Sequence, residues 1–353
     1  MRALDLCAGI GGFRFGVETS MISTDVQFVG YSDIDQYANK AYKSMYEVTG
    51  EVELGDIQKF TRLEDEYNKQ GPLAKSKLRT QQVNKGIPDF DFLFAGFPCQ
   101  PHSLMGNRKG NVDARGSLFY DIAELIRIKQ PEYFILENVK AITSVNQGYF
   151  FNEIVDTLSN TLKYNLKVWS LNAADYGVPQ TRRRVFFVGS RKNKLPNELP
   201  MRVCLEESEY PTTWHLLERN VSEKYFLSEK ILKTILKDQH KGYSRKAEIN
   251  KLIARPVCKS MHKMHRASQD NYYSEDFVHG QFDQLNKNVK FAEINSPRIR
   301  RITPKEGLRI QSFPDALINR LIEADFSDTR LYMMAGNAVP PQLVQRIINH
   351  IFQ

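Results

Sequence analysis

The sequence predicts an α/β protein with a mostly parallel, doubly wound sheet and a smaller second domain. Short apolar runs alternate with amphipathic stretches through the first half of the chain, as is typical of a parallel sheet with helices on both faces. From about residue 191 to residue 295 this alternation is lost. The chain has 353 residues, a length that suggests about two domains.

Composition narrows the class of protein. Apolar residues make up 41% of the chain, enough for a substantial core, and the net charge of +8 favours a polyanionic partner such as nucleic acid, although many basic proteins bind none. The four cysteines form no CxxC pair, so we expect neither a zinc site nor a disulfide framework. No apolar stretch approaches the roughly 20 residues that a membrane helix needs, and Asp5 interrupts any signal-peptide run. We therefore expect a soluble cytoplasmic protein without a metal or a membrane partner.

Five apolar runs are the expected strands. A helix is expected at residues 118–128, where apolar side chains recur at helical spacing, and another near residues 343–351. Residues 68–88 break the pattern because they are polar and carry five basic residues and no acid; we favour a solvated loop here over a DNA-contacting insertion. The expected strands are residues 3–6, 26–31, 90–95, 133–136 and 185–188.

A glycine-rich turn follows the first expected strand. Gly9, Gly11 and Gly12 allow a tight turn and a close approach of the backbone to a ligand, and the start of the next helix favours an anionic group. The spacing differs from the dinucleotide pattern GxGxxG. Asp33 comes 21 residues after Gly12, where an acid accepts hydrogen bonds from ribose hydroxyls in nucleotide-binding α/β folds. The pair indicates an adenosine-containing cofactor, with a purely structural glycine turn as the alternative.

Cys99 lies on a proline-rich turn after the third expected strand. A lone cysteine usually belongs to the core. Gly96 and the two prolines around this cysteine instead place the thiol on a turn at the carboxyl end of a strand, where open α/β sheets bind ligands. The following residues 103–116 are polar and include three glycines, which suits a mobile lid or an ordinary connection.

Charged side chains are expected near the same edge. Glu137 lies at the end of the fourth strand, so its carboxylate should share the edge that carries Cys99. Arg182 and Arg184 should point to one side of the fifth strand and Arg183 to the other. These arginines indicate either two guanidinium groups directed at a substrate or a solvated basic cluster.

Eight short motifs follow one another along the chain: DLCAGIGGFRFG, SDID, GDI, GFPCQPHS, ENV, QTRRR, RRITPKEGLRIQSFP and AGNAVPPQLV. In this order they make the chain resemble the bacterial DNA (cytosine-5)-methyltransferases of type II restriction-modification systems. The uncovered part, residues 191–295, is where that family carries its variable target-recognition region. His102 stands where the family usually has Phe, Cys7 where it often has Phe, and Asp33 where it often has Glu.

The resemblance implies a class I S-adenosylmethionine-dependent methyltransferase fold with a smaller target-recognition domain. We expect residues 1–190 and 330–353 to form the catalytic and cofactor-binding domain, and residues 191–329 to form the target-recognition domain. The implied cofactor is S-adenosyl-L-methionine, whose product is S-adenosyl-L-homocysteine, and no metal is implied. Its expected contacts are Asp5, Cys7, Gly9, Gly11, Gly12, Asp33, Ile34, Asp56, Ile57, Pro98 and Asn337.

The resemblance also implies covalent catalysis. The Cys99 thiolate adds to C6 of cytosine, Glu137 contacts the N3/N4 edge, and C5 accepts the methyl group before losing its proton. Positive charge from Arg182 or Arg184 favours the thiolate. Because the target base is out of reach inside a duplex, base flipping is implied, with residues 103–116 closing over the extruded base.

The segment 251–274 is a further candidate for DNA contacts. It holds five basic residues and one acid, with two histidines and two tyrosines among them, which suits phosphate contacts and some base-edge contacts; a solvated surface is the alternative. His262 and His265 are not expected to bind a metal, because no cysteine or acid completes a set. The residues expected to touch DNA are Gln100, Ser103, Arg115, Arg255, Lys259, Lys263 and Arg266.

Double-stranded DNA is therefore the expected partner of a monomeric enzyme. A restriction endonuclease that acts on the same site without direct contact is a further candidate partner. Two alternatives stay open. One is an RNA (cytosine-5)-methyltransferase, although the large basic region before RRITP favours duplex DNA, and the other is a catalytically silent DNA-binding relative, suggested by His102.

Overall fold

The computed structural model describes residues 1–63, 72–98, 118–203, 207–236, 248–280 and 298–353. Four expected site residues lie outside these ranges, namely Cys99, Gln100, Ser103 and Arg115. His102 and the whole expected lid also lie outside them.

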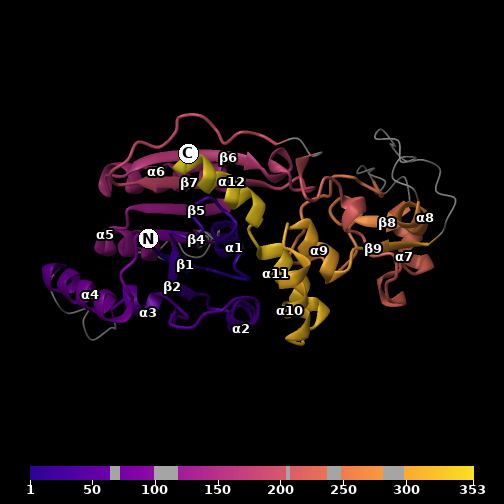
Figure 1. Ribbon diagram of the computed structural model, residues 1–353, viewed down its shortest axis with the longest axis horizontal. Coiled ribbons are helices and arrows are strands. Elements are labelled where there is room, and N and C mark those ends of the chain that lie inside the picture. The colour runs from indigo at the N-terminus through magenta and orange to yellow at the C-terminus, as the bar shows by residue number, and fades with distance from the viewer. Residues whose placement is uncertain (64–71, 99–117, 204–206, 237–247, 281–297) are drawn as a thin grey trace, which may run out of the picture.

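A seven-stranded sheet organises the larger part of the molecule (Figure 1). Its strand order is β3-β2-β1-β4-β5-β7-β6, and neighbours are parallel except at β7, which runs antiparallel to both β5 and β6. The prediction of a mostly parallel sheet is confirmed, and the arrangement matches the class I methyltransferase fold that the resemblance implies. The strands are β1 Arg2–Leu6, β2 Gln27–Ser32, β3 Val52–Glu53, β4 Phe92–Gly96, β5 Tyr133–Val139, β6 Asn165–Asn172 and β7 Arg183–Ser190.

Helices cover both faces of the sheet, as the term doubly wound requires. Strand side chains alternate between the faces, so Phe94 belongs to one core and its neighbour Leu93 to the other. α1 and α12 pack on the Phe94 side, whereas α4, α5 and α6 pack on the Leu93 side. The helices are α1 Gly12–Glu18, α2 Gln36–Met45, α3 Gln58–Thr61, α4 Pro72–Gly86, α5 Leu118–Lys129, α6 Tyr149–Asp156 and α12 Pro341–Phe352.

All five expected strands and both expected helices are confirmed, but the loop expected at residues 68–88 is wrong, because residues 72–86 form α4. The helix has almost no amphipathic pattern to reveal it. Val83 is its only buried residue, and Leu73 is 88% exposed. Arg79 forms an ion pair with Glu124 of α5 at 3.3 Å, so contacts with neighbouring helices support this segment.

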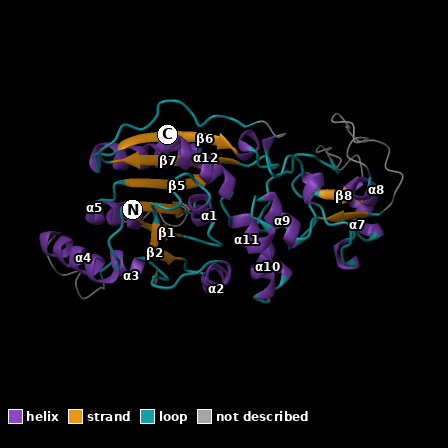
Figure 2. Cartoon of the chain, in the orientation of Figure 1, coloured by secondary structure: helices purple, strands orange, loops and turns teal. Residues whose placement is uncertain are grey.

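The remaining elements form a smaller, less regular region beside the carboxyl edge of the sheet (Figure 2). α9, α10 and α11 share a continuous core with α2, in which Ile310 and Ile318 pack with Tyr42 and Tyr46. The expected domain boundaries at residues 190–191 and 329–330 stay predictions. The elements are α7 Glu229–Leu236, β8 Tyr272–Ser274, α8 Glu275–His279, β9 Ile299–Arg301, α9 Pro304–Ile310, α10 Asp315–Glu323 and α11 Asp328–Asn337, with β8 antiparallel to β9.

None of the helices in the described ranges combines the length and the apolar character that crossing a bilayer requires.

Candidate active site

One edge of the sheet gathers most of the predicted site residues. The parallel strands β1, β2, β4 and β5 all end there, and the reversed strand β7 begins there. Gly96 of β4 lies opposite Glu137 of β5, and Val139 lies opposite Arg184 of β7. The cofactor turn, the start of the cysteine turn, the glutamate and the arginine motif therefore share this edge.

The glycine turn after β1 has the left-handed backbone that its glycines allow. Gly9 has a φ of 56° and Gly11 a φ of 71°, and both angles are costly for residues with a side chain. The Gly9 amide donates to the Asp33 carboxylate at 3.0 Å, which ties the turn to the end of β2. A Cβ atom on Gly9 would meet nothing within 4 Å, so this part of the turn faces open space.

Gly12 brings the end of the chain against the turn. A Cβ atom at Gly12 would lie 2.1 Å from the backbone oxygen of Val339, so only glycine permits this approach. Asn337, at the end of α11, is exposed two residues before Val339. The turn and Asn337 are thereby held close together, although they are more than 300 residues apart in sequence.

Asp5 carries a buried carboxylate beneath the turn. Its side chain has no exposed surface, and neither carboxylate oxygen has a hydrogen-bond partner among the described residues. Burial raises the pKa of Asp5 well above its usual range, while the positive charge of Arg14 opposes the rise. Burial likewise raises the pKa of the Cys7 thiol. A positive charge near this unpaired buried carboxylate would favour its ionised form.

The other predicted cofactor residues follow β2, β3 and β4. Both carboxylate oxygens of Asp33 accept backbone amides, from Gly9 and from Asp35, and burial raises its pKa. Ile34 is 77% exposed, an unusual position for a large apolar side chain. Asp56 accepts the amide of Gln58 at 3.0 Å. Ile57 is buried and Pro98 is exposed.

Glu137 and Arg184 form a largely buried ion pair. Arg184 Nε lies 2.6 Å from Glu137 Oε1, and the two side chains are 13% and 10% exposed. Burial raises the pKa of Glu137, whereas Arg184 and then Arg182 oppose the rise. Asn138 donates its amide to the carbonyl of Phe97 at 2.9 Å, which fixes the start of the cysteine turn beside Glu137. The Glu137 carboxyl can therefore form hydrogen bonds either as a carboxylate acceptor or as a protonated donor.

Arg182 differs from Arg184 in the groups that its guanidinium contacts. It lies on the same side of the chain as Arg184, and Arg183 is exposed, as predicted. The terminal nitrogens of Arg182, however, donate to three backbone carbonyls at 2.8 to 2.9 Å. Burial, reinforced by Arg184, lowers the pKa of Arg182 to about 9. Its expected catalytic role stays a prediction, and these contacts show that the side chain also joins separate backbone segments. The carbonyls belong to Val257, Gly336 and Ala338.

The basic side chains of the candidate DNA-contacting segment 251–274 include two that are paired with acids and two that are exposed to solvent. Arg255 pairs with Glu248 at 3.1 Å and Arg266 pairs with Asp270 at 2.9 Å, so internal acids already neutralise both guanidinium groups. Lys259 and Lys263 are exposed to solvent. DNA contacts by all four residues stay predictions, and the geometry favours the two lysines.

Sequence reasoning assigned no role to three residues that organise this edge. Gln180 is fully buried and hydrogen-bonds Val257 and Ile310. Tyr46 donates to the carbonyl of Gly11 at 2.9 Å and supports the cofactor turn. Gly336 contacts the backbone of Lys259 so closely that a Cβ atom would lie 2.0 Å from its nitrogen. Gln180 and Gly336 lie inside motifs, but their partners are distant in sequence.

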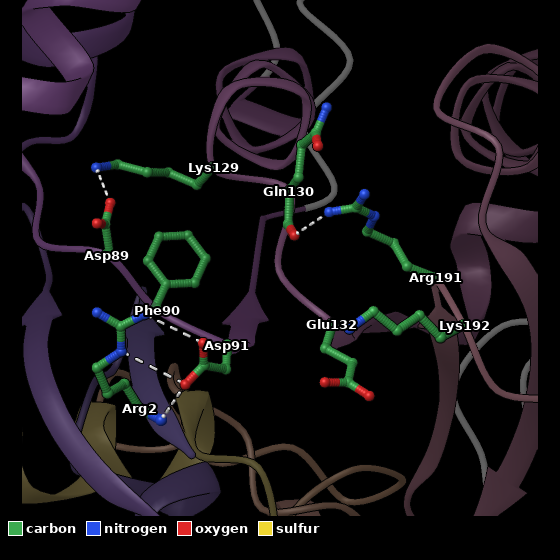
Figure 3. Close-up of a pocket in the computed structure, with 9 residues that line it drawn as sticks. All are labelled: Arg2, Asp89, Phe90, Asp91, Lys129, Gln130, Glu132, Arg191 and Lys192. Atoms are coloured by element: carbon green, nitrogen blue, oxygen red, sulfur yellow. Dashed lines mark hydrogen bonds and ion pairs between the residues drawn. The ribbon is translucent and has the colours of Figure 1, made fainter.

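A separate pocket of about 330 Å³ lies at the opposite, amino edge of the sheet (Figure 3). Arg2 pairs there with Asp91, and Lys129 pairs with Asp89 at 2.8 Å. This pocket contains none of the predicted site residues. Across the described ranges, no cluster of three or more histidine, cysteine or acidic side chains is arranged to hold a metal ion.

Comparisons with known proteins agree with the fold. The family model for C-5 cytosine-specific DNA methylases matches residues 1–353. The Type II methyltransferase M1.ScrFI of Lactococcus lactis subsp. cremoris is 30% identical over 100% of this chain and 78% of its own length. The Type II methyltransferase M.NlaX of Neisseria lactamica is 30% identical over 98% of this chain and 94% of its own.

Solved structures share the fold at lower identity. The Dnmt2 methyltransferase of S. pombe has a TM-score of 0.71 at 19% identity, covering 100% of this chain and 98% of that one. The Entamoeba histolytica methyltransferase EhMeth has a TM-score of 0.66 at 21% identity, with coverage of 100% and 98%. The match of the family model to the entire chain decides the matter: this protein belongs to the C-5 cytosine-specific DNA methylase family.

Proposed function

We propose that this protein transfers a methyl group from S-adenosyl-L-methionine to C5 of a cytosine within a specific sequence of double-stranded DNA. The observation that carries the proposal is the Glu137–Arg184 pair beside the start of the cysteine turn, in a chain that the family model matches throughout. The Type II methyltransferase relatives support a sequence-specific target.

The glycine turn and its surroundings supply the proposed cofactor site. S-adenosyl-L-methionine, when bound, supplies an electrophilic methyl group on a positively charged sulfur. The unpaired carboxylate of Asp5 and the open space beside Gly9 suit such a cationic ligand. Asp33 keeps lone pairs for ribose hydroxyls, and the exposed side chain of Ile34 offers an apolar surface to the adenine. The remaining proposed contacts are Cys7, Gly11, Gly12, Asp56, Ile57, Pro98 and Asn337.

Cys99 and Glu137 have the proposed catalytic roles. The Cys99 thiolate adds to C6 of an extruded cytosine, which makes C5 nucleophilic enough to accept the methyl group. Loss of the C5 proton then expels the thiolate and restores the aromatic ring. Glu137 contacts the N3/N4 edge, and burial favours its protonated form, which is the form that donates to N3. Arg184 holds Glu137 in place and adds positive charge.

Lys259 and Lys263 are the proposed phosphate contacts in the target-recognition region, because they are exposed while Arg255 and Arg266 are paired with acids. We further propose that the protein acts as a monomer in the cytoplasm, and that a restriction endonuclease acting on the same site accompanies it without direct contact. Gln100, Ser103 and Arg115 complete the proposed DNA contacts.

Covalent trapping tests the proposal. A duplex in which 5-fluorocytosine replaces cytosine carries no C5 proton, so attack by Cys99 should leave a denaturation-resistant complex when S-adenosyl-L-methionine is present. The wild type should form this complex and Cys99→Ala should not, although the variant should still bind duplex DNA. A trapped tRNA with an untrapped duplex would make RNA the substrate. DNA binding without any trapping would indicate a silent binding protein.

A further inference from the structure

The residues that lead into β7 contact a segment of the target-recognition region. Residues 179–181 exchange backbone hydrogen bonds with Ala254, in which the amide of Thr181 donates to Ala254 and the amide of Ala254 donates to Pro179, both at 2.9 Å. These contacts join the catalytic sheet directly to a part of the chain more than 70 residues away.

Val257, three residues later, is held from both sides. Its amide donates to Gln180 Oε1 at 2.8 Å, and its carbonyl accepts from Arg182 at 2.9 Å. Gln180 is 0% exposed and Arg182 is 2% exposed. We use the term clamp for Gln180 and Arg182 together. Buried side chains thus satisfy both backbone groups of Val257, which fixes the position of this segment relative to the residues that lead into β7.

The remaining groups of the clamp reach the C-terminal motifs. Gln180 Nε2 donates to the carbonyl of Ile310 at 3.1 Å, and Arg182 donates to the carbonyls of Gly336 and Ala338 at 2.8 and 2.9 Å. The backbone of Lys259 packs on Gly336, where a Cβ atom would lie 2.0 Å from the Lys259 nitrogen. The clamp therefore joins the target segment to the turn that also carries the proposed cofactor residue Asn337.

We propose that Gln180 and Arg182 are positioning residues that set the distance between the DNA-contacting lysines and the catalytic carboxylate. The inference rests on the proposed function and deepens it. Two residues after Arg182, Arg184 holds Glu137, so one short stretch of chain fixes both the recognition segment and the catalytic group. The partner is the sugar–phosphate backbone beside the target cytosine, which the exposed Lys259 and Lys263 face once the segment is in register.

The test uses Arg182→Lys and Gln180→Ala in the full-length protein, with Arg183→Ala as the matched control on an exposed neighbour. A lysine cannot reproduce a planar guanidinium that serves three carbonyls in different directions. Hydrogen–deuterium exchange of residues 252–263 reports the clamp itself. Steady-state kinetics on the duplex sequence identified as methylated, and on the same duplex with one base pair altered, report its consequence.

Both clamp variants should exchange deuterium faster in residues 252–263, and the control should not. KM for the duplex should rise about tenfold, and discrimination against the altered duplex should fall about tenfold. Unchanged exchange, or a fall in kcat alone with KM and discrimination intact, would overturn the inference. If the wild type methylates no DNA, the proposed function fails, and the exchange measurement still decides whether the clamp exists.

Discussion

Replacing Arg184 with alanine should destabilise the protein in a strongly pH-dependent way. The substitution removes a guanidinium whose Nε lies 2.6 Å from Glu137 Oε1, in a pair whose side chains are 13% and 10% exposed. Arg182 cannot take its place, because backbone carbonyls occupy its terminal nitrogens. Glu137 must then either remain a buried, uncompensated charge or take up a proton.

The size and direction of the effect follow from those two options. Removing one partner of a buried ion pair costs about 3–5 kcal/mol when the other stays charged. Burial already raises the pKa of Glu137 and Arg184 opposes the rise, so the variant should raise it further. Stability that comes from a raised pKa is present at low pH and lost as pH rises through the folded-state value. The loss should therefore be small at low pH, where Glu137 is protonated, and should grow as pH rises, by no more than about 1.4 kcal/mol per pH unit.

Urea unfolding of the wild type and Arg184→Ala at several pH values measures this directly. Glu137→Gln completes a double-mutant cycle. In the Glu137→Gln background, the stability loss caused by Arg184→Ala should depend little on pH, because position 137 no longer carries a carboxyl group. An equal loss of stability at low and high pH, or a coupling energy near zero, would refute the reasoning that Arg184 compensates a buried charge on Glu137.

Three further predictions use other buried groups. Asp5→Asn should make the stability of the free protein less sensitive to rising pH, because the raised pKa of Asp5 causes stability to be lost as pH rises. The same variant should bind S-adenosyl-L-methionine more weakly, because it removes an unpaired buried carboxylate. Thermal unfolding at two pH values checks the first effect and calorimetry the second, and unchanged cofactor affinity would argue against the role of Asp5 in binding. Glu306→Ala should cost about 3–5 kcal/mol in urea unfolding, since it strands the 2% exposed Arg300; a loss under about 1 kcal/mol would contradict this. Gly12→Ala should abolish cofactor binding in calorimetry, because its Cβ would lie 2.1 Å from a backbone oxygen, whereas Gly307→Ala, with 3.8 Å of clearance, should bind normally.

The buried strands were predictable because each contains a short run of apolar residues next to a motif. β6 was not, because it is an edge strand in which Trp169 and Leu171 are its buried side chains and the rest are partly or fully exposed. α4 was missed for a related reason, since Val83 is the only buried residue along its length. A periodic signal requires several buried positions, and these two elements lack them.

The site was predictable in its composition but not in its connections. Motif order and strand ends place Glu137 and Arg184 at one edge, and the structure pairs them at 2.6 Å. The sequence does not reveal that Arg182 faces Val257 and Gly336, because those partners are 75 and 154 residues away in the chain. Nor does it separate free from neutralised cations, since Arg255 resembles Lys259 until its pairing with an acid is seen. Long-range pairing, rather than residue type, decides these roles.

Bisulfite sequencing of DNA from a cytosine-methylation-deficient bacterial host tests the central claim most directly. The host would express either the wild type or Cys99→Ala at matched soluble levels. The account predicts protected cytosines at one short recurring sequence in the wild type and none in the variant. Protection that persists with Cys99→Ala would remove Cys99 from the nucleophile role, and no protection with soluble wild type would contradict DNA methylation by this protein.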